Sequence, residues 1–202
     1  MEQENAGALS GKKIVLGVTG GIAAYKAVEI ASRLKKAGAE VHVIMTRGAE
    51  NFVTELTFRE ISGQPVTTDM WAKVPHYHVE HIALATLADA VLIAPATANV
   101  LAKAAADMLT TTLLATKAPV FAAPAMNTNM YENPVTQRNL RDLAARGYHI
   151  IEPASGMLAC GVRGKGRLPE PAAIVEELAA FFAKGKELAG KKVLVTAGGT
   201  IE

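Results

Sequence analysis

Cysteine, aromatic residues and long apolar runs are scarce in this sequence, and each scarcity excludes a class of protein. The single cysteine, Cys160, cannot form an internal disulfide, which excludes a secreted fold held together by disulfides. The most apolar region, residues 82–106, is interrupted by charged residues such as Asp89 and Lys103, so no transmembrane helix is expected. Aromatic residues make up only 5% of the chain, which predicts a core of small aliphatic side chains.

The sequence also has no block of like charges and no common metal-binding motif. Its formal net charge is +2, so we expect no dedicated nucleic-acid surface. The first ten residues, MEQENAGALS, lack the basic start and apolar stretch of a signal peptide. Together with the lone cysteine, this predicts a cytoplasmic protein without a membrane partner. Neither a CxxC nor an H-E-x-x-H pattern occurs, so no metal site is predicted.

The first part of the chain has the pattern of a strand, a helix and a second strand. Residues 13–19 are rich in β-formers, and the glycine pair at 20–21 follows them. The next stretch, IAAYKAVEIASRLKKAG, has apolar residues at helical spacing, and Gly38 is a natural helix stop. Residues 40–46 predict the second strand. This βαβ unit implies a parallel sheet with a right-handed crossover.

The remaining pattern predicts a doubly wound α/β fold of the Rossmann or flavodoxin-like type, with a parallel sheet covered by helices on both faces. It should occupy residues 1–190. Further strands are expected at 90–94, 119–123 and 148–151, and helices at 97–105, 108–117, from Asn133 to Gly147, and 171–184. Two stretches do not fit. Residues 63–80 are polar and aromatic, and residues 153–171 hold four glycines and three prolines, which predicts a long mobile loop of the kind that forms lids.

The turn Thr19-Gly20-Gly21 is a candidate phosphate site. Glycine permits a positive φ and a close approach of ligand to backbone, and the N-terminus of the following helix favours an anion. A tight turn without a ligand is the alternative. No G-x-G-x-x-G motif occurs, and the second strand ends in Thr46 rather than in an acidic residue that would bind an adenosine ribose. A mononucleotide is therefore favoured over NAD.

Two more strand ends carry candidate ligand-binding residues. The segment APATANV follows the strand at 90–94, and its small residues Ala96, Thr97 and Ala98 would let a flat ring lie on the backbone. Asn99 could hydrogen bond to that ring, although Thr97 or Asn99 could equally be a helix N-cap. The segment APAMNTNMYENP follows the strand at 119–123.

In that second segment, the amide of Asn127 could bind a substrate carboxylate without adding charge. The alternative for Asn127 is an Asx-turn. Met130 is also a candidate substrate contact, although methionines at such positions more often serve packing.

The five histidines differ in their predicted roles. His81 stands at the start of a predicted helix, and a histidine side chain suits proton transfer near neutral pH. We expect His42 and His149 to be structural, because they lie in or next to predicted strands. His76 and His78 fall in the aromatic stretch, where surface or interface roles are expected.

Cys160 lies among glycines, close to Arg163 and Lys165. An electropositive setting lowers the pKa of a thiol, which makes chemistry plausible at a cysteine that would otherwise be inert.

The end of the sequence, GKKVLVTAGGTIE, echoes its start, GKKIVLGVTGGIA. It could be the last strand of the same domain. We favour the alternative, in which residues 191–202 begin a second domain with a phosphate-binding turn of its own.

Taken together, these motifs resemble those of the homo-oligomeric flavin-containing cysteine decarboxylases. The segments TGGIAAYK, EHI, APATAN, PAMNTNMY and ACGVRGKGR occur in that order over residues 12–185. Within the family, the similarity is greatest to the decarboxylase domains of bacterial bifunctional coenzyme A biosynthesis enzymes, in which a phosphopantothenate–cysteine ligase domain follows. KKVLVTAGGTIE looks like the beginning of such a ligase domain.

The resemblance implies FMN as the cofactor and 4′-phosphopantothenoylcysteine as the substrate, which is decarboxylated to 4′-phosphopantetheine. It implies roles for His81 in proton transfer or positioning, for Asn127 in holding the substrate carboxylate, and for Cys160 as a proton donor. It also implies assembly as trimers or as dodecamers. The flavin contacts would come from Gly20-Gly21, Thr46 and the PATAN segment.

One departure and three alternatives accompany the resemblance. Between Ala104 and Leu109 this sequence is shorter than the family pattern. The same chemistry would serve a peptide with a C-terminal cysteine. Related flavin prenyltransferases share the fold, but Cys160 and PAMNTNM argue against that activity. A non-catalytic regulatory flavoprotein is disfavoured because His81, Asn127 and Cys160 are all present.

Overall fold

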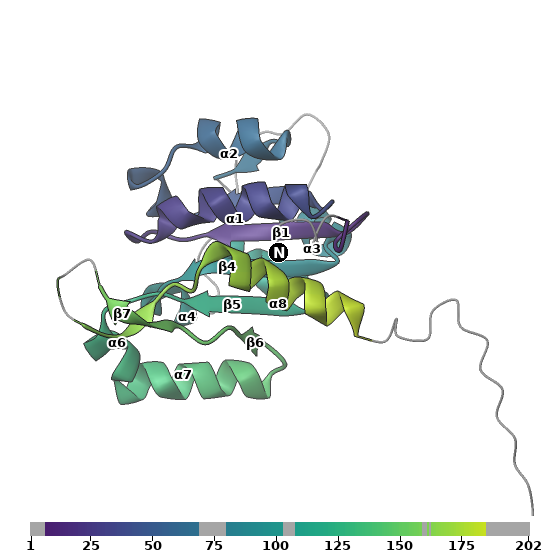
Figure 1. The fold of residues 1–202 in the computed structure, drawn as a ribbon. Helices are drawn as coiled ribbons and strands as arrows, with labels where there is room; N and C mark the ends of the chain where they lie inside the picture. Colours follow the sequence, from purple (N-terminus) through teal and green to yellow (C-terminus); the bar gives the residue numbers. More distant parts are fainter. Residues whose placement is uncertain (1–6, 69–79, 103–107, 159–160, 162, 185–202) are drawn as a thin grey trace, which may run out of the picture.

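A six-stranded parallel sheet lies at the centre of the structure, a computed structural model that describes residues 7–68, 80–102, 108–158, 161 and 163–184 (Figure 1). The strand order is β3-β2-β1-β4-β5-β6, and each neighbouring pair is parallel. This order confirms the predicted doubly wound fold. The strands are β1 (Lys13–Val18), β2 (Glu40–Met45), β3 (Val66–Thr67), β4 (Ala90–Ala96), β5 (Val120–Pro124) and β6 (His149–Ile150).

Helices cover both faces of this sheet. Those on one face share a buried cluster that includes Ile30, Phe58 and Ile174. Those on the other face share a cluster that includes Leu84, Leu109 and Leu140. The first face carries α1 (Ala24–Lys36), α2 (Glu55–Ser62) and α8 (Pro171–Ala183); the second carries α3 (Glu80–Leu87), α4 (Ala98–Ala102), α5 (Met108–Ala115), α6 (Thr128–Glu132) and α7 (Pro134–Ala145). A short 3-10 helix, η1 (Ala49–Asn51), follows β2.

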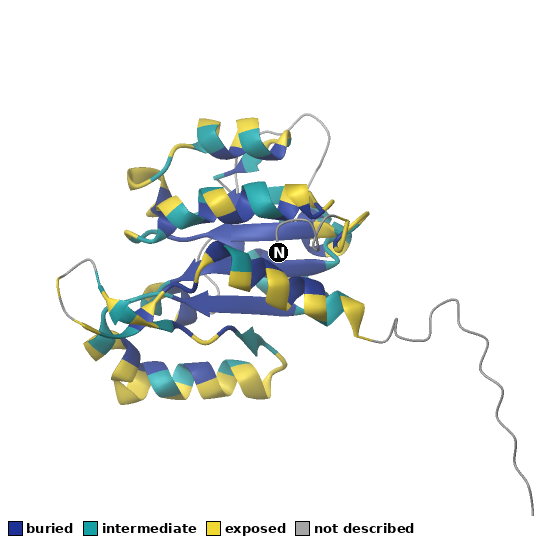
Figure 2. Cartoon of the chain, viewed as in Figure 1, coloured by how far each residue is buried: buried dark blue, intermediate teal, exposed yellow. Residues whose placement is uncertain are grey.

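The strands alternate between these two clusters because their side chains point to opposite faces with a period of two. Leu16 and Val18 of β1 belong to the α1 side, and Val15 belongs to the α5 side. Gly17 lets α5 lie directly on the sheet, because a Cβ there would stand 2.5 Å from Cδ1 of Leu109. The strands are accordingly buried along most of their length (Figure 2).

Most predicted elements are present, with their ends shifted by a residue or two. Helix α7 begins as expected, since the Asn133 side chain accepts a hydrogen bond from the N–H of Val135 at 2.9 Å. Gly147 follows this helix with a φ of 92° and ends it as predicted. The sequence analysis missed α2 and β3, and the helix expected at 97–105 is described only as α4.

The prediction of a long loop over residues 153–171 was wrong. This segment contains an antiparallel hairpin of β7 (Ala154–Met157) and β8 (Arg163–Arg167). In β8 the sequence R-G-K-G-R alternates long cations with glycines, and this period of two is that of a strand. The glycines allow close packing: Gly166 contacts the backbone of Met126, and its carbonyl accepts the N–H of Met126 at 2.9 Å. The sequence analysis treated the glycines as signs of a loop.

Candidate active site

The candidate site lies at the carboxyl edge of the sheet, where β1 and β4 are neighbours. The strand order runs from β1 to β2 and β3 on one side, and from β4 to β5 and β6 on the other. Doubly wound sheets bind ligands in the crevice outside such a switch point. The predicted cofactor residues end or follow strands β1, β2 and β4 at this edge: Thr19, Gly20, Gly21, Thr46, Ala96, Thr97, Ala98 and Asn99.

Thr19 joins the turns that follow β1 and β4. Its side chain is buried, with 1% exposed, and its hydroxyl donates to the carbonyl of Pro95 at 2.6 Å. The same oxygen lies 3.2 Å from the hydroxyl of Thr97 and 3.4 Å from its backbone nitrogen, which donates to it. Thr19 therefore holds the half-buried Thr97 in place at the switch point.

The two glycines of the turn serve different purposes, and neither adopts the positive φ that glycine permits. A Cβ at Gly20 would stand 2.5 Å from the carbonyl carbon of Gly48, so glycine is needed there for backbone packing against the turn after β2. A Cβ at Gly21 would meet only Cγ2 of Thr97 at 3.4 Å, which is an ordinary contact. Gly21 is therefore the position where a ligand can approach the backbone.

The N-terminus of α1 follows this turn and suits an anion. Its N-cap residue, Ala23, makes no capping hydrogen bond with its side chain, and the first turn holds no acidic residue. The first N–H groups of a helix carry a partial positive charge and bind phosphate in many nucleotide sites.

Thr46 belongs to the same group through its neighbour Gly48. The Thr46 N–H donates to the carbonyl of Val18 at 3.0 Å, which extends the pairing of β1 and β2 by one residue. The contact between Gly48 and Gly20 then brings the half-buried Thr46 beside the phosphate turn. The structure thus collects the ends of β1, β2 and β4 around one point.

Asn127 follows β5 and caps the short helix α6. Its Oδ1 accepts the N–H of Asn129 at 2.9 Å, so the Asx-turn that we weighed as an alternative is present. The segment lies beside the end of β4, because the N–H of Ala125 donates to the carbonyl of Ala96 at 3.1 Å. Met130 is 49% exposed, so it does not serve core packing within this chain. A carboxylate contact at Asn127 stays a prediction.

His81 is the second residue of α3. It is half buried in α3, which packs against α5 on the face of the sheet opposite α1. His42 and His149 are structural, as predicted: His42 pairs with Glu40 at 2.7 Å, and the ring of His149 stacks on Phe121 with centroids 4.6 Å apart. His76 and His78 lie outside the described residues.

Cys160 also lies outside the described residues; in the sequence it falls between β7 and β8. The cations expected near it are placed in β8. Lys165 Nζ donates to Glu152 at 2.7 Å and lies 5.4 Å from the centre of the Tyr131 ring. The hydrogen bond with Glu152 is the main cause that raises the pKa of Lys165 above its usual value. Glu152 therefore balances part of the positive charge that was predicted near Cys160.

Three residues that shape the site had no role assigned to them from the sequence. Gly48 contacts the phosphate turn, the Pro95 carbonyl holds Thr19, and Gly166 packs on the Asn127 segment. Gly48 could have been noticed as a glycine two residues past Thr46, at a strand end. Within the described residues, no group of three or more potential metal-binding side chains occurs, and no helix is long and apolar enough to span a membrane.

The fold and these converging turns define the class of doubly wound α/β proteins, with a candidate nucleotide site at the switch point of the sheet. More particularly, the chain belongs to the Flavoprotein family, whose model matches residues 2–183. It is 50% identical over 198 residues to the coenzyme A biosynthesis bifunctional protein CoaBC of Vibrio cholerae, covering 96% of this chain and 49% of that protein. The chain thus spans about half the length of the curated relatives it matches.

Two solved structures of similar fold are decarboxylases by name. A cysteine-to-serine mutant of PPC decarboxylase complexed with pantothenoylaminoethenethiol superposes with a TM-score of 0.76 at 32% identity, over 86% of this chain and 99% of that one. The FMN-dependent cysteine decarboxylase SpaF superposes with a TM-score of 0.75 at 30% identity, over 87% and 99% of the two chains.

Proposed function

We propose that this chain decarboxylates 4′-phosphopantothenoylcysteine to 4′-phosphopantetheine with FMN as its cofactor. The observation that carries the proposal is the convergence of the turns after β1, β2 and β4 on one anion-binding helix N-terminus. The similarity of this chain to PPC decarboxylase, over 99% of that structure, supports the proposed reaction and substrate.

The residues at the switch point fit a flavin mononucleotide. The uncapped N-terminus of α1 and the open backbone at Gly21 would hold the single phosphate. Thr97 and Ala98 offer small side chains beside which a flat ring can lie, and Thr46 and Asn99 offer polar groups. When bound, FMN would supply two-electron redox chemistry, accepting electrons from the substrate and returning them later in the same cycle.

The substrate's cysteine moiety is well suited to that chemistry. Removing two electrons and two protons from its CH2–SH group gives a thioaldehyde. Loss of CO2 is then favourable, because the electron pair left at the carbon delocalises onto sulfur as an enethiolate. Returning the two electrons with three protons gives the thiol product. Two of these protons replace those removed in the oxidation and the third takes the place of CO2, so the reaction has no net redox change.

The chain's own residues would bind the reacting group and move its protons. Asn127 would hold the carboxylate until CO2 leaves, using an amide whose orientation is set by its cap on Asn129. His81 would transfer or position a proton during oxidation. Cys160 would give a proton to the substrate carbon during the final reduction.

Decarboxylation of a peptide with a C-terminal cysteine is the second candidate, because SpaF, a cysteine decarboxylase, superposes nearly as well. Mass spectrometry of the products from both substrates separates the two. We expect the purified, FMN-containing chain to convert 4′-phosphopantothenoylcysteine much faster than a peptide with a C-terminal cysteine. The reverse preference would overturn the proposed substrate, and no reaction with either would overturn the proposed reaction.

Three further predictions concern the protein as a whole. Residues 191–202 lie outside the described residues, and their assignment to a following ligase domain stays a prediction. Cytoplasmic location also stays a prediction. Assembly as a trimer or dodecamer agrees with the exposure of large apolar side chains on α1 and nearby elements, such as Ile22, Tyr25 and Leu56. Light scattering of the purified chain would measure its oligomeric state.

A further inference from the structure

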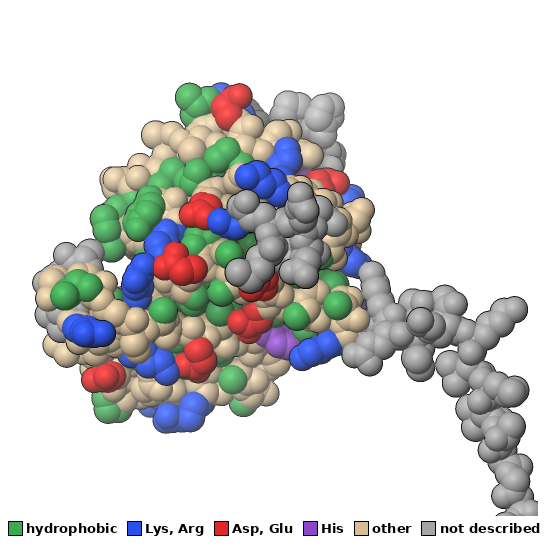
Figure 3. Space-filling model, in the orientation of Figure 1, with side chains coloured by type: hydrophobic (Ala, Val, Ile, Leu, Met, Phe, Trp, Pro, Cys, Tyr) green, Lys and Arg blue, Asp and Glu red, His purple; other side chains and the backbone are tan. Residues whose placement is uncertain are grey.

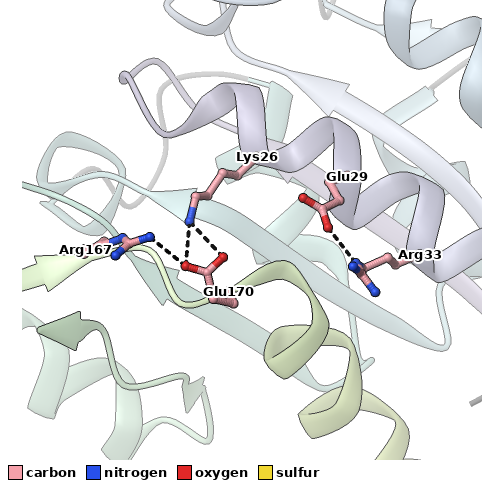
Figure 4. A network of polar contacts seen from close by, with 5 residues as sticks. All are labelled: Lys26, Glu29, Arg33, Arg167 and Glu170. Carbon is pink, nitrogen blue, oxygen red and sulfur yellow. Dashed lines mark hydrogen bonds and ion pairs between the residues drawn. The ribbon is translucent and has the colours of Figure 1, made fainter. Parts of the chain in front are cut away.

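A cluster of charged side chains joins three elements beside the candidate site (Figure 4). Glu170 immediately precedes α8. Its carboxylate accepts hydrogen bonds from Lys26 Nζ of α1 at 3.2 and 3.3 Å, and from Arg167 Nη2 of β8 at 2.7 Å. One carboxylate therefore connects α1, the β7–β8 hairpin and the start of α8.

Two features show that this cluster is more than a surface ion pair. Glu170 is the N-cap residue of α8, yet its side chain makes no capping hydrogen bond and is used for the contacts between elements instead. Lys26 has only 11% of its side chain exposed and lies in the first turn of α1, where the helix dipole disfavours a cation. The Glu170 carboxylate offsets this unfavourable placement of Lys26, through hydrogen bonds that are themselves exposed to solvent.

The cluster leads from the phosphate turn to the Asn127 segment. Helix α1 begins at Ala24, three residues after Gly21, so Lys26 in its first turn stands close to the phosphate turn in the sequence. Arg167 adjoins Gly166, whose carbonyl accepts the N–H of Met126 at 2.9 Å. Asn127 follows Met126 in the sequence. Glu170 thus stands between the element that would hold the cofactor phosphate and the segment that would hold the substrate carboxylate.

We propose that Glu170 is a positioning residue, which sets the distance between the Asn127 segment and the phosphate turn through Lys26 and Arg167. This inference rests on the proposed function. Glu170 touches neither substrate nor cofactor in this account and acts only through the elements it connects.

The stability of the chain should depend little on this cluster. The Glu170 and Arg167 side chains are 63% and 45% exposed, and exposed ion pairs contribute little to the free energy of unfolding. A small misplacement of reacting groups, in contrast, can slow an enzyme by up to about 100-fold. A positioning role therefore predicts a loss of activity without a matching loss of stability.

The test compares Glu170→Gln with Glu29→Gln in the FMN-containing chain. Glu29 is a matched control, because it pairs with Arg33 at 2.8 Å on the exposed side of the same helix and has no link to the hairpin (Figure 4). For each variant we would measure flavin content, thermal unfolding and kcat/KM for 4′-phosphopantothenoylcysteine. We would also measure inhibition by 4′-phosphopantetheine, which lacks the carboxylate but is otherwise the same molecule.

For Glu170→Gln we expect kcat/KM to be about one tenth of that of Glu29→Gln, or lower. Flavin content, thermal unfolding and inhibition by 4′-phosphopantetheine should be the same in the two variants. Arg167→Gln should show the same defect, and the double variant should lose little more, because both changes break one connection.

Three outcomes bear against the inference or its basis in different ways. A kcat/KM of Glu170→Gln equal to that of Glu29→Gln would overturn it. If kcat/KM for the substrate and the inhibition by 4′-phosphopantetheine fall by the same factor, or if flavin is lost, the role of Glu170 is merely structural. Either result would also overturn the inference. Absence of turnover in the unmodified chain would instead overturn the proposed function.

Discussion

The hydroxyl of Thr19 donates to the carbonyl of Pro95 at 2.6 Å, and this bond fastens the turn after β1 to the end of β4. Both partners are buried. The two turns on which a flavin would rest are therefore held together before any ligand binds, which reduces the cost of ordering them on binding.

Replacing Thr19 with valine should disturb this link while keeping the shape of the side chain. The buried carbonyl of Pro95 would lose its donor, which typically costs about 1–3 kcal/mol of the free energy of unfolding. Urea denaturation and FMN titration would measure the changes in stability and affinity. Thr19→Ser keeps the hydroxyl and is the control; if the valine variant is as stable and binds FMN as tightly as the serine variant, the link is unimportant.

The two glycines of the turn should respond differently to alanine. Gly20→Ala places a Cβ against the Gly48 backbone, which cannot move aside easily, so we expect a loss of stability. Gly21→Ala has room within the chain, and we expect normal stability but weaker FMN binding, because the methyl group would obstruct the approach of the phosphate. Thermal unfolding of the FMN-free variants and FMN titration check this pair. Unchanged FMN affinity in Gly21→Ala would show that the ligand does not approach there.

A sequence can predict most of this sheet because four of its strands, β1, β2, β4 and β5, are buried apolar runs with clear ends. For that reason we predicted the strands at 13–19 and 40–46. The cap at Asn133 was predicted from its place at the start of an expected helix. Strand β3 has only two residues and no apolar run, so it gives almost no signal. Strand β8 was missed because its glycines, which permit close packing, are also the usual signs of a loop.

The candidate site was predicted from residues at strand ends, and that rule places Thr19, Thr46 and Thr97 correctly together. It could not reveal that Gly20 is required by Gly48, because that contact joins turns far apart in the sequence. The same holds for Glu170 and Lys26, whose pairing depends on how α8 packs against α1.

Variants of His81 and Cys160 should separate the two halves of the proposed reaction. His81→Asn should retain the yellow flavin yet lose decarboxylation, because proton handling during oxidation would fail. Cys160→Ser should still decarboxylate but accumulate an oxidised product, because the final protonation would fail. Visible spectra and mass spectrometry measure both. Full activity of the first variant, or normal product formation at the normal rate by the second, would contradict the assigned role.

Asp89 should make the chain sensitive to acid at the edge of the sheet far from the site. The Lys13 N–H donates to its carboxylate at 2.8 Å, and this bond, with help from Lys12, lowers the pKa of Asp89. A carboxyl group with a lowered folded pKa stabilises the fold above its unfolded pKa of about 3.9, and that stability is lost as the pH falls through the folded pKa.

The stability difference between the unmodified chain and Asp89→Asn should therefore be largest near neutral pH and shrink below pH ~4. Because the side chain is partly exposed, the difference should be below about 1 kcal/mol. Urea denaturation across this pH range is the measurement. A difference that does not change with pH would show that the carboxylate charge is unimportant.

The most direct test of the central claim is the stoichiometry of the reaction under anaerobic conditions, with no added oxidant or reductant. CO2 and 4′-phosphopantetheine would be quantified against the FMN present in the purified chain. The account predicts equal amounts of both products and many turnovers for each FMN, because the electrons removed from the substrate are returned to it. A reaction that stops after one turnover per FMN, or that forms no 4′-phosphopantetheine, would contradict it.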